Sequence, residues 1–358
     1  MKIKLILFTI AIICSTLPSF AFENIRVIIA DDQKTVILTS KSRLDIEGNS
    51  DAEWVKKMTF SSATMFNHPI RVRSADELVF VDRKSYHGWI ELRKKKNGRI
   101  LVINDLDIED YLKGVIPAEV PAHWEREALK AQAVASRTYA LYQKGVSGDR
   151  PYHILSSVKS QVYNGSGRER LNVNRAVRET RGIVLAYQGK VIPAFYHASC
   201  GGHTENAAEL WGIDEPYLKG VNCECQNIMQ DALWEKRLTI PKVLGALSRL
   251  GYRMGTITDM SIKEITDAGR VRTISIRDAG KTILVPAEAL RASLGNTVLP
   301  SVFYELEFIG NEAVFSGRGS GHGVGMCQWG AQEMALRGIN YQTILQHYYP
   351  GTVLTRMK

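Results

Sequence analysis

A single acidic residue, Glu119, stands in surroundings that suit acid–base chemistry. It lies in the run Asp110–Pro121, between two prolines and with an apolar residue on each side. Apolar neighbours favour the neutral form of a carboxyl group, which is the form that a general acid needs near neutral pH. The prolines predict that Glu119 sits on a stiffened loop. The alternative, that Glu119 caps a helix beginning near Trp124, is weakened by the intervening Pro121.

Small and apolar residues then recur at helical spacing, which predicts a closely packed helix over Trp124–Lys144. Two cations, Lys130 and Arg137, lie two turns apart on one side of it. An arginine among alanines is costly unless it pairs with a carboxylate or a ligand. The sequence leaves both open: a structural ion pair, or contact with an anionic substrate.

A polar turn, Phe195–Asn206, follows a predicted strand, and aromatic residues continue to Pro216–Leu218. Aromatic rings can stack on the apolar face of a sugar while polar groups bind its hydroxyls. The candidates for such contacts are Tyr196, His197, Asn206 and Tyr217.

The glycine-rich run Gly317–Gly325 superficially looks like a phosphate cradle. It matches neither the dinucleotide fingerprint nor the P-loop. Its glycines more plainly allow the backbone to approach a polymer or another strand. His322, inside the run, is either a structural histidine or a ligand contact.

The N-terminus predicts export. Lys2 and Lys4 precede the apolar run Leu5–Ile13, and small residues ending at Ala21 have the spacing of a signal-peptidase site. The apolar run is too short to span a bilayer. We therefore expect residues 1–21 to be a signal peptide, and the mature protein to lie in the periplasm or at the outer face of the cytoplasmic membrane.

Removal of that peptide takes away one of the five cysteines, Cys14. Four cysteines remain: Cys200, Cys223, Cys225 and Cys327. In an oxidising compartment the closeness of the first three predicts a disulfide from Cys200 to Cys223 or Cys225. Zinc held with His197 or His203 is the alternative, but the spacing matches no standard zinc pattern. We expect the disulfide and no metal.

The chain is basic, with a net charge of +9 that becomes +7 once Lys2 and Lys4 are removed. Outside the cytoplasm, an anionic wall polymer or lipid is the commoner partner of such a protein. No stripe of interleaved basic and aromatic residues and no recognition motif points to nucleic acid. A charge that serves solubility alone remains an alternative.

The pattern of elements predicts a strand-dominated α+β fold. Residues 22–100 read as short strands, and residues 233–315 as a small α/β insertion within a domain spanning 101–358. The expected strands are Arg26–Ala30, Thr35–Thr39, Glu77–Val81, Ile90–Arg93, Met260–Thr266, Arg272–Arg277 and Phe303–Phe308. The further expected helices are Pro241–Leu250, Ala287–Leu294, Gln328–Leu336 and Tyr341–Tyr348.

Four blocks in order resemble the sporulation stage II protein D and amidase-enhancer (SpoIID/LytB) family of peptidoglycan-acting proteins. They are Asp110–Tyr139, Ser160–Tyr163, Phe195–Leu218 and Gly317–Gly351. The resemblance covers residues 100 to 354. It implies a SpoIID-like catalytic core and a lytic transglycosylase that cleaves between N-acetylmuramic acid and N-acetylglucosamine, leaving 1,6-anhydro ends.

The resemblance also implies roles for particular residues. The catalytic acid falls on Glu119 and the arginine of the family's helix on Arg137, while Tyr196 and Tyr217 align with tyrosines of a substrate groove. Hydrolytic glycosidases usually need two carboxylates. Here the 6-hydroxyl of the muramic acid is the nucleophile, so one glutamate can act as acid and then as base.

The chain departs from the family at one place. Some relatives carry a metal-binding His/Cys cluster just before the Gln-Val-Tyr motif, whereas this chain has only His153 there, with serines and a lysine in 156–160. We therefore expect no zinc at that position and no cofactor.

Two other functions compete with the transglycosylase. The first is a non-catalytic glycan-binding protein that enhances an N-acetylmuramoyl-L-alanine amidase, which would then be a partner. The second is a metal-dependent amidase, for which no ligand set has the usual spacing. If the chain is an enzyme, we expect it to prefer glycan strands stripped of their stem peptides, because Arg137 or Lys130 could pair with the free lactyl carboxylate.

Overall fold

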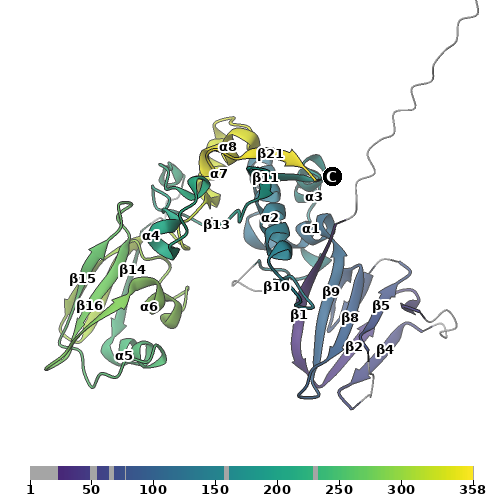
Figure 1. Ribbon diagram of the computed structural model, residues 1–358, viewed down its shortest axis with the longest axis horizontal. Coiled ribbons are helices and arrows are strands. Elements are labelled where there is room, and N and C mark those ends of the chain that lie inside the picture. The colour runs from purple at the N-terminus through teal and green to yellow at the C-terminus, as the bar shows by residue number, and fades with distance from the viewer. Residues whose placement is uncertain are drawn as a thin grey trace, which may run out of the picture.

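The computed structural model describes residues 23–48, 55–63, 68–76, 78–156, 161–228 and 233–357. A helical core lies between two strand-rich parts, and the three form an arch (Figure 1). The described residues hold eight α-helices and 21 strands, which confirms the strand-dominated α+β class. None of these helices is long and apolar enough to cross a membrane. The predicted signal peptide lies outside the described residues.

The N-terminal part consists of two sheets of mostly antiparallel strands. The larger sheet has the order β10 (Ile154–Leu155), β1 (Asn24–Gln33), β9 (Ile100–Asp107), β8 (Trp89–Lys94), β5 (Ile70–Ser74) and β3 (Leu44–Ile46). The smaller sheet has the order β4 (Lys57–Ser61), β2 (Thr35–Thr39), β6 (Leu78–Val81) and β7 (Lys84–His87).

Strand β9 joins the N-terminal sheets to the helices. All its residues except the last are buried, so it has no solvent-facing side. The predicted boundary between residues 100 and 101 therefore falls within a buried strand. One continuous hydrophobic core runs from Ile25 of β1 to Tyr349 near the C-terminus. The N-terminal strands are thus part of the body that carries the helices.

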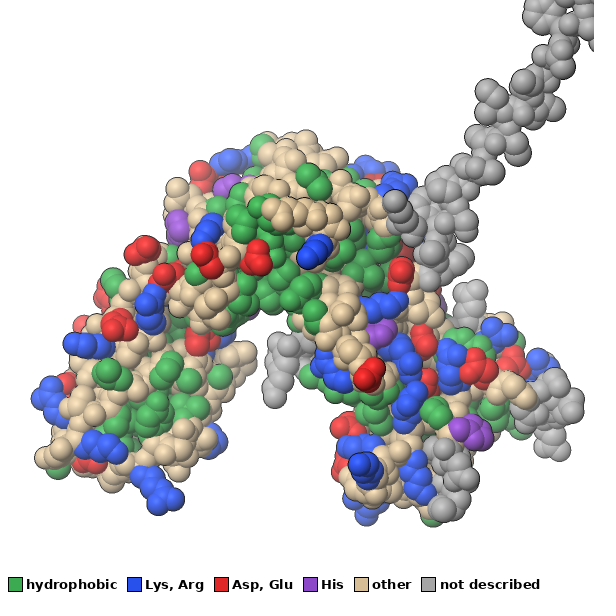
Figure 2. Space-filling model, in the orientation of Figure 1, with side chains coloured by type: hydrophobic (Ala, Val, Ile, Leu, Met, Phe, Trp, Pro, Cys, Tyr) green, Lys and Arg blue, Asp and Glu red, His purple; other side chains and the backbone are tan. Residues whose placement is uncertain are grey.

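Helix α2 (Arg126–Gly145) is the centre of the helical core and touches all the helices around it. Those neighbours are α1 (Ile108–Glu119), α3 (Leu171–Glu179), α7 (Gln328–Leu336) and α8 (Tyr341–Tyr348). Its buried alanines, such as Ala131 and Ala135, allow close approach. Hydrophobic side chains also gather on the inner side of the arch below the helices (Figure 2).

Short elements close the core. A three-stranded sheet has the order β12 (Lys190–Val191), β11 (Ile183–Tyr187) and β21 (Val353–Arg356). The parallel pair β13 (Tyr196–His197) and β20 (Met326–Cys327) brings two distant segments together, and α4 (Ala207–Trp211) follows β13.

Within residues 233–315, which the sequence predicts as an insertion, lies a second hydrophobic core. Its strands are β14 (Leu233–Thr239), β15 (Asp259–Ile265), β16 (Val271–Arg277), β17 (Thr282–Pro286), β18 (Tyr304–Ile309) and β19 (Glu312–Arg318). They form two three-stranded sheets, in the orders β14-β19-β18 and β15-β16-β17. The two helices are α5 (Ile240–Arg249) and α6 (Ala287–Leu294).

The sequence analysis was wrong about the segment before Pro121, which is helix α1 and not a loop. Asp107 caps it by accepting a hydrogen bond from the Glu109 N–H at 2.7 Å. Its buried residues recur at helical spacing: Ile108, Tyr111, Leu112, Val115 and Ile116. Pro117 is tolerated in the last turn, and the helix ends at Glu119 because a residue before proline favours an extended backbone.

Candidate active site

Glu119 is the last residue of α1, and its side chain is partly buried. The Val162 N–H donates a hydrogen bond to its Oε1 at 3.0 Å. Burial raises the pKa of Glu119 above its ordinary value, while hydrogen bonds from Val162 and the Gln328 side chain hold it down. None of the described groups that shift this pKa is a second carboxylate. A larger fraction of Glu119 is therefore protonated at neutral pH than of an exposed glutamate.

The Val162 N–H is positioned by its fully buried neighbour, Gln161. The Tyr111 hydroxyl donates to the Gln161 Oε1 at 2.9 Å. The Gln161 Nε2 donates to the Ser136 carbonyl at 3.2 Å and to the Tyr196 hydroxyl oxygen at 3.0 Å. This amide makes three bonds, so the loop that carries Val162 is fixed against α1, α2 and β13.

Gln328 reaches the site from the first position of α7. Its Nε2 donates to the Gln132 Oε1 at 3.3 Å, and the Gln132 Nε2 donates to the Ser136 Oγ at 2.9 Å. A row of amides and a hydroxyl thus connects α7 with α2 next to Glu119. These groups bring no charge to the site. The Gln328 hydrogen bond lowers the pKa of Glu119 but does not cancel the rise that burial causes.

Tyr196 also lies near Glu119. Burial raises the pKa of its hydroxyl well above the ordinary value, and the negative charge of Glu119 raises it further. Tyr196 therefore remains a neutral phenol, able to donate or accept a hydrogen bond beside the carboxyl group.

Aromatic side chains continue from Tyr196 toward the insertion. The Phe195 ring lies 6.0 Å from Tyr139 and 4.9 Å from Trp211, measured between ring centroids. Trp211 is 40% exposed and lies 5.0 Å from His322. Burial, with the charges of nearby arginines, lowers the pKa of His322 to about 4, so its ring is neutral at pH 7. The cluster Tyr139, Phe195, Trp211 and His322 is uncharged and partly open, as stacking on a sugar requires.

Comparison with known proteins shows which family this chain belongs to. The family model described as "Stage II sporulation protein" (SpoIID) matches residues 96–187, and a model of a domain of unknown function matches residues 207–325. Stage II sporulation protein D of Bacillus subtilis is 30% identical over 275 residues, which are 71% of this chain and 76% of that protein. The chain belongs to the SpoIID/LytB family.

Two further relatives extend the match. An uncharacterised protein of Brachyspira hyodysenteriae is 38% identical over 256 residues, covering 71% of this chain and 68% of the relative. The amidase enhancer of Bacillus subtilis is 30% identical over 349 residues and covers 84% of this chain, but this chain spans only 48% of that enhancer.

Of the other candidate residues for the SpoIID-like site, three have structural partners. His197 is buried and its Nδ1 lies 3.1 Å from the Val324 carbonyl oxygen. Asn206 caps α4 by accepting from the Ala208 N–H at 3.1 Å. Tyr217 is buried against Tyr187, with ring centroids 5.3 Å apart.

The structure places Arg137, the second predicted catalytic residue, in a buried ion pair and not beside Glu119. Its side chain is 0% exposed, and its Nε and Nη2 donate to the two carboxylate oxygens of Glu109 at 2.9 and 2.7 Å. It also donates to the carbonyls of Val177 and Ile183. The structural ion pair, one of the two readings left open, is therefore the one in the structure. A guanidinium so enclosed has no donor directed at a substrate.

Lys130, which the sequence analysis proposed as a substrate contact, also pairs with carboxylates of the protein. Its Nζ lies 2.8 Å from a Glu127 carboxylate oxygen and 3.3 Å from one of Glu179. Of the two cations that the sequence analysis proposed for a lactyl carboxylate, Arg137 and Lys130, both are already paired with carboxylates of the protein.

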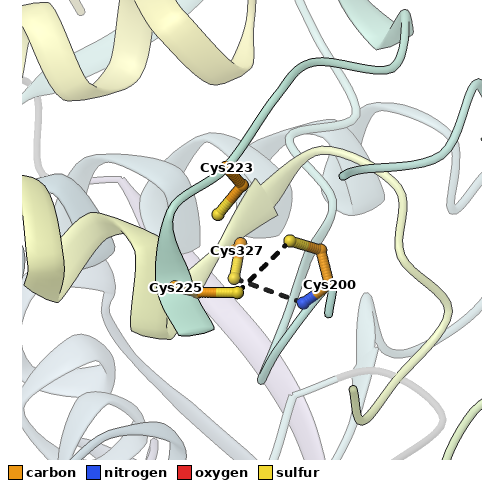
Figure 3. A group of neighbouring side chains, drawn as sticks. All are labelled: Cys200, Cys223, Cys225 and Cys327. Atoms are coloured by element: carbon orange, nitrogen blue, oxygen red, sulfur yellow. Dashed lines mark hydrogen bonds between the residues drawn. The ribbon is translucent and has the colours of Figure 1, made fainter. Parts of the chain in front are cut away.

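The predicted disulfide is not formed in the structure. All four described cysteines are free, and the Sγ atoms of Cys200 and Cys225 are 3.5 Å apart, whereas a disulfide needs about 2.05 Å. Cys327, which the sequence analysis left outside the pairing, joins the other three in one cluster (Figure 3).

Sequence reasoning missed Gln161, Gln328, Tyr139 and Trp211 as parts of the site. Both Gln161 and Gln328 are buried, which marks a polar side chain as part of a hydrogen-bond network. The sequence alone does not show this burial, because most glutamines are exposed.

Replacement of Arg137 by alanine should destabilise the protein. Glu109 would remain buried without its counter-charge, so the free energy of unfolding should fall by about 3–5 kcal/mol. Denaturant unfolding followed by circular dichroism measures this. Arg126→Ala is the matched control, because Arg126 is in the same helix but 51% exposed in its ion pair with Glu179, and its loss should change the free energy of unfolding far less. If Arg137→Ala were as stable as the parent but bound glycan more weakly, Arg137 would be a substrate contact and not a structural residue.

Proposed function

We propose that this chain is an exported peptidoglycan lytic transglycosylase, with Glu119 as its acid and base. The observation that carries the proposal is the partly buried carboxyl group of Glu119, whose pKa is raised and which is held by uncharged hydrogen-bond donors. A glycosidase that activates water normally needs a second carboxylate. One glutamate suffices if the nucleophile belongs to the substrate.

The reaction would proceed by two proton transfers at Glu119. The protonated carboxyl donates its proton to the glycosidic oxygen as the bond from C1 of N-acetylmuramic acid to N-acetylglucosamine breaks. The resulting carboxylate accepts the proton of the muramic 6-hydroxyl as that oxygen bonds to C1. The products are a free N-acetylglucosamine 4-hydroxyl and a 1,6-anhydro end, and no water is consumed.

The surroundings of Glu119 support a saccharide substrate. Tyr196 offers a neutral phenol beside the carboxyl group, and Trp211 offers a partly exposed ring within the aromatic cluster. Neutral His322 adds a flat, uncharged surface at neutral pH. Such a cluster suits the apolar faces and hydroxyls of a glycan strand.

The proposal extends to strand type, partner and compartment. Because Arg137 and Lys130 are both paired, a preference for strands without stem peptides rests on the family resemblance and on the uncharged aromatic cluster. An amidase that removes stem peptides is the proposed partner, a link suggested by the amidase enhancer among the relatives. Export rests on the N-terminal pattern of residues 1–21.

A second candidate function has support from the same relative. A non-catalytic protein that binds glycan and enhances an amidase would share the aromatic cluster but have no turnover. Incubation of purified glycan strands with the protein alone separates the two candidates. Formation of anhydromuramyl ends supports the enzyme. Binding without products, together with a higher rate of an added amidase, supports the enhancer.

Glu119→Gln should fold yet release no anhydromuramyl ends, because an amide cannot donate the proton. Loss of a general acid lowers the rate by roughly 10²–10⁴-fold. The amide oxygen can still accept the Val162 N–H, and the cost of the buried charge is removed, so the thermal midpoint should not fall. Glu125→Gln is the control, since Glu125 is exposed and should keep parental activity. Product release by Glu119→Gln at the parental rate would remove Glu119 from the mechanism.

The pH dependence of kcat/KM should report the pKa of Glu119 in the free enzyme. The protonated form is the active one, so kcat/KM should be full below that raised pKa and fall as the pH rises through it. Gln328→Met removes a donor that lowers the pKa, and should move the falling limb to higher pH. Gln346→Met, at an exposed position of α8, should leave the limb where it is. A limb that does not move in Gln328→Met would contradict the assigned contact.

Initial rates on intact and amidase-treated strands, compared at equal saccharide concentration, test the preference for denuded glycan. We expect faster release of anhydromuramyl ends from the treated strands, because a stem peptide adds bulk to the sugar that must reach Glu119. Arg126→Ala should show the same ratio of rates as the parent, since Arg126 is bound to Glu179. Equal rates on the two substrates would exclude the preference without affecting the role of Glu119.

A further inference from the structure

A cluster of four buried cysteines lies where three distant segments of the chain meet (Figure 3). Cys200 lies in the turn after β13, Cys223 and Cys225 lie in the loop before the insertion, and Cys327 ends β20. All four Sγ atoms lie within 4.8 Å of one another. Cys327 is 127 residues from Cys200 in sequence.

The spacing of the sulfur atoms suits a tetrahedral metal ion. Zinc binds cysteine sulfur at about 2.3 Å, so the sulfurs of a tetrahedral site lie about 3.8 Å apart. The Sγ atoms of Cys200 and Cys225 are 3.5 Å apart. The four sulfurs converge on a common centre, whereas two disulfides would draw them into two separate pairs.

Backbone N–H groups are directed at the sulfurs. The Cys200 N–H and the Gly330 N–H each donate to the Cys327 Sγ at 3.3 Å, and the Gly202 N–H donates to the Cys200 Sγ at 3.4 Å. Such hydrogen bonds stabilise thiolates and orient them as ligands. They are made by turns whose course is already fixed, so the cluster is preorganised.

A glycine makes room for the cluster. A Cβ atom on Gly330 would collide with the Cys223 Sγ and the Tyr348 hydroxyl oxygen. The Tyr348 hydroxyl lies 3.2 Å from that sulfur and completes its surroundings.

A buried cation adjoins the cluster. The Arg270 guanidinium is 2% exposed and donates to the Cys200 carbonyl at 2.7 Å and the His203 carbonyl at 3.0 Å. Its carboxylate neighbour, Glu205, is as far as 3.9 Å away. Zinc with four thiolates carries a charge of −2, which would complement this guanidinium.

We propose that Cys200, Cys223, Cys225 and Cys327 bind one Zn²⁺ ion as a closed structural site. Four thiols bind as thiolates and release their protons to solvent, with no change of oxidation state. With all four positions filled by protein, the ion has no open position for substrate. Its role is to clamp the loop at 223–225 onto the pair β13–β20. The proposal is independent of the reaction proposed for Glu119.

The full exported protein, purified without chelator, should contain about one zinc ion per chain by elemental mass spectrometry. Its four thiols should react with an alkylating reagent only after unfolding in the presence of a chelator. Removal of zinc should lower the thermal midpoint, and zinc should restore it. Cobalt in place of zinc should give visible d–d bands and a thiolate charge-transfer band typical of four-sulfur coordination.

Cys225→Ser should lose stoichiometric zinc, whereas Ser199→Ala, which changes a buried neighbour but no ligand, should retain it. If Cys225→Ser fails to fold, the zinc content and cobalt spectrum of the parent protein still decide. Disulfides among these cysteines without zinc, stoichiometric iron, or reduced thiols that bind no added zinc would each overturn the proposal.

Discussion

The buried ion pair between Arg137 and Glu109 is the interaction on which the helical core depends. It joins α1 to α2, and Arg137 also donates to carbonyls of α3 and of β11. The same Glu109 carboxylate accepts the Gly182 N–H at 3.1 Å. A charge pair this deep adds little net stability over an apolar core, but loss of one partner is expensive. The ion pair therefore favours one arrangement of α1, α2, α3 and β11. That arrangement fixes the direction of α1, which places Glu119 about 15 Å further along the axis.

The chemistry at Glu119 has a cost in stability that the core must offset. Because its pKa is raised in the folded protein, the folded state binds its proton more tightly than the unfolded chain does. Stability is unaffected by this group below the ordinary pKa of 4.5, and falls as the pH rises from there through the folded-state pKa. Above the raised folded-state pKa the protein bears that cost in full. A carboxyl group kept for stability alone would be exposed or paired with a cation, and Glu119 has neither arrangement.

How much the sequence predicts depends on how local the cause is. The helices at Ala287–Leu294, Gln328–Leu336 and Tyr341–Tyr348 have the predicted bounds, because periodicity and capping act within a few residues. Helix α1 was missed because two prolines obscured a periodic apolar face. Glu119 was proposed from its neighbours in sequence, and the loop predicted for it is the last turn of a helix. The predictions for Arg137 and the cysteines differ from the structure because the partners of these residues are far away in sequence. No local pattern shows which distant group a buried charge or thiol contacts.

The candidate active site and the cysteine cluster share one short strand pair. In β13–β20, Tyr196 lies opposite Met326 and His197 opposite Cys327. Tyr196 is next to Glu119, and Cys200 follows four residues later. On the other strand, Cys327 directly precedes Gln328, which contacts Glu119. A pair of two-residue strands has few ladder hydrogen bonds to hold its register, and a slip of one residue would turn every side chain to the opposite face. Contacts of Cys327 in the cysteine cluster and of Gln328 and Tyr196 in the amide network help to hold that register.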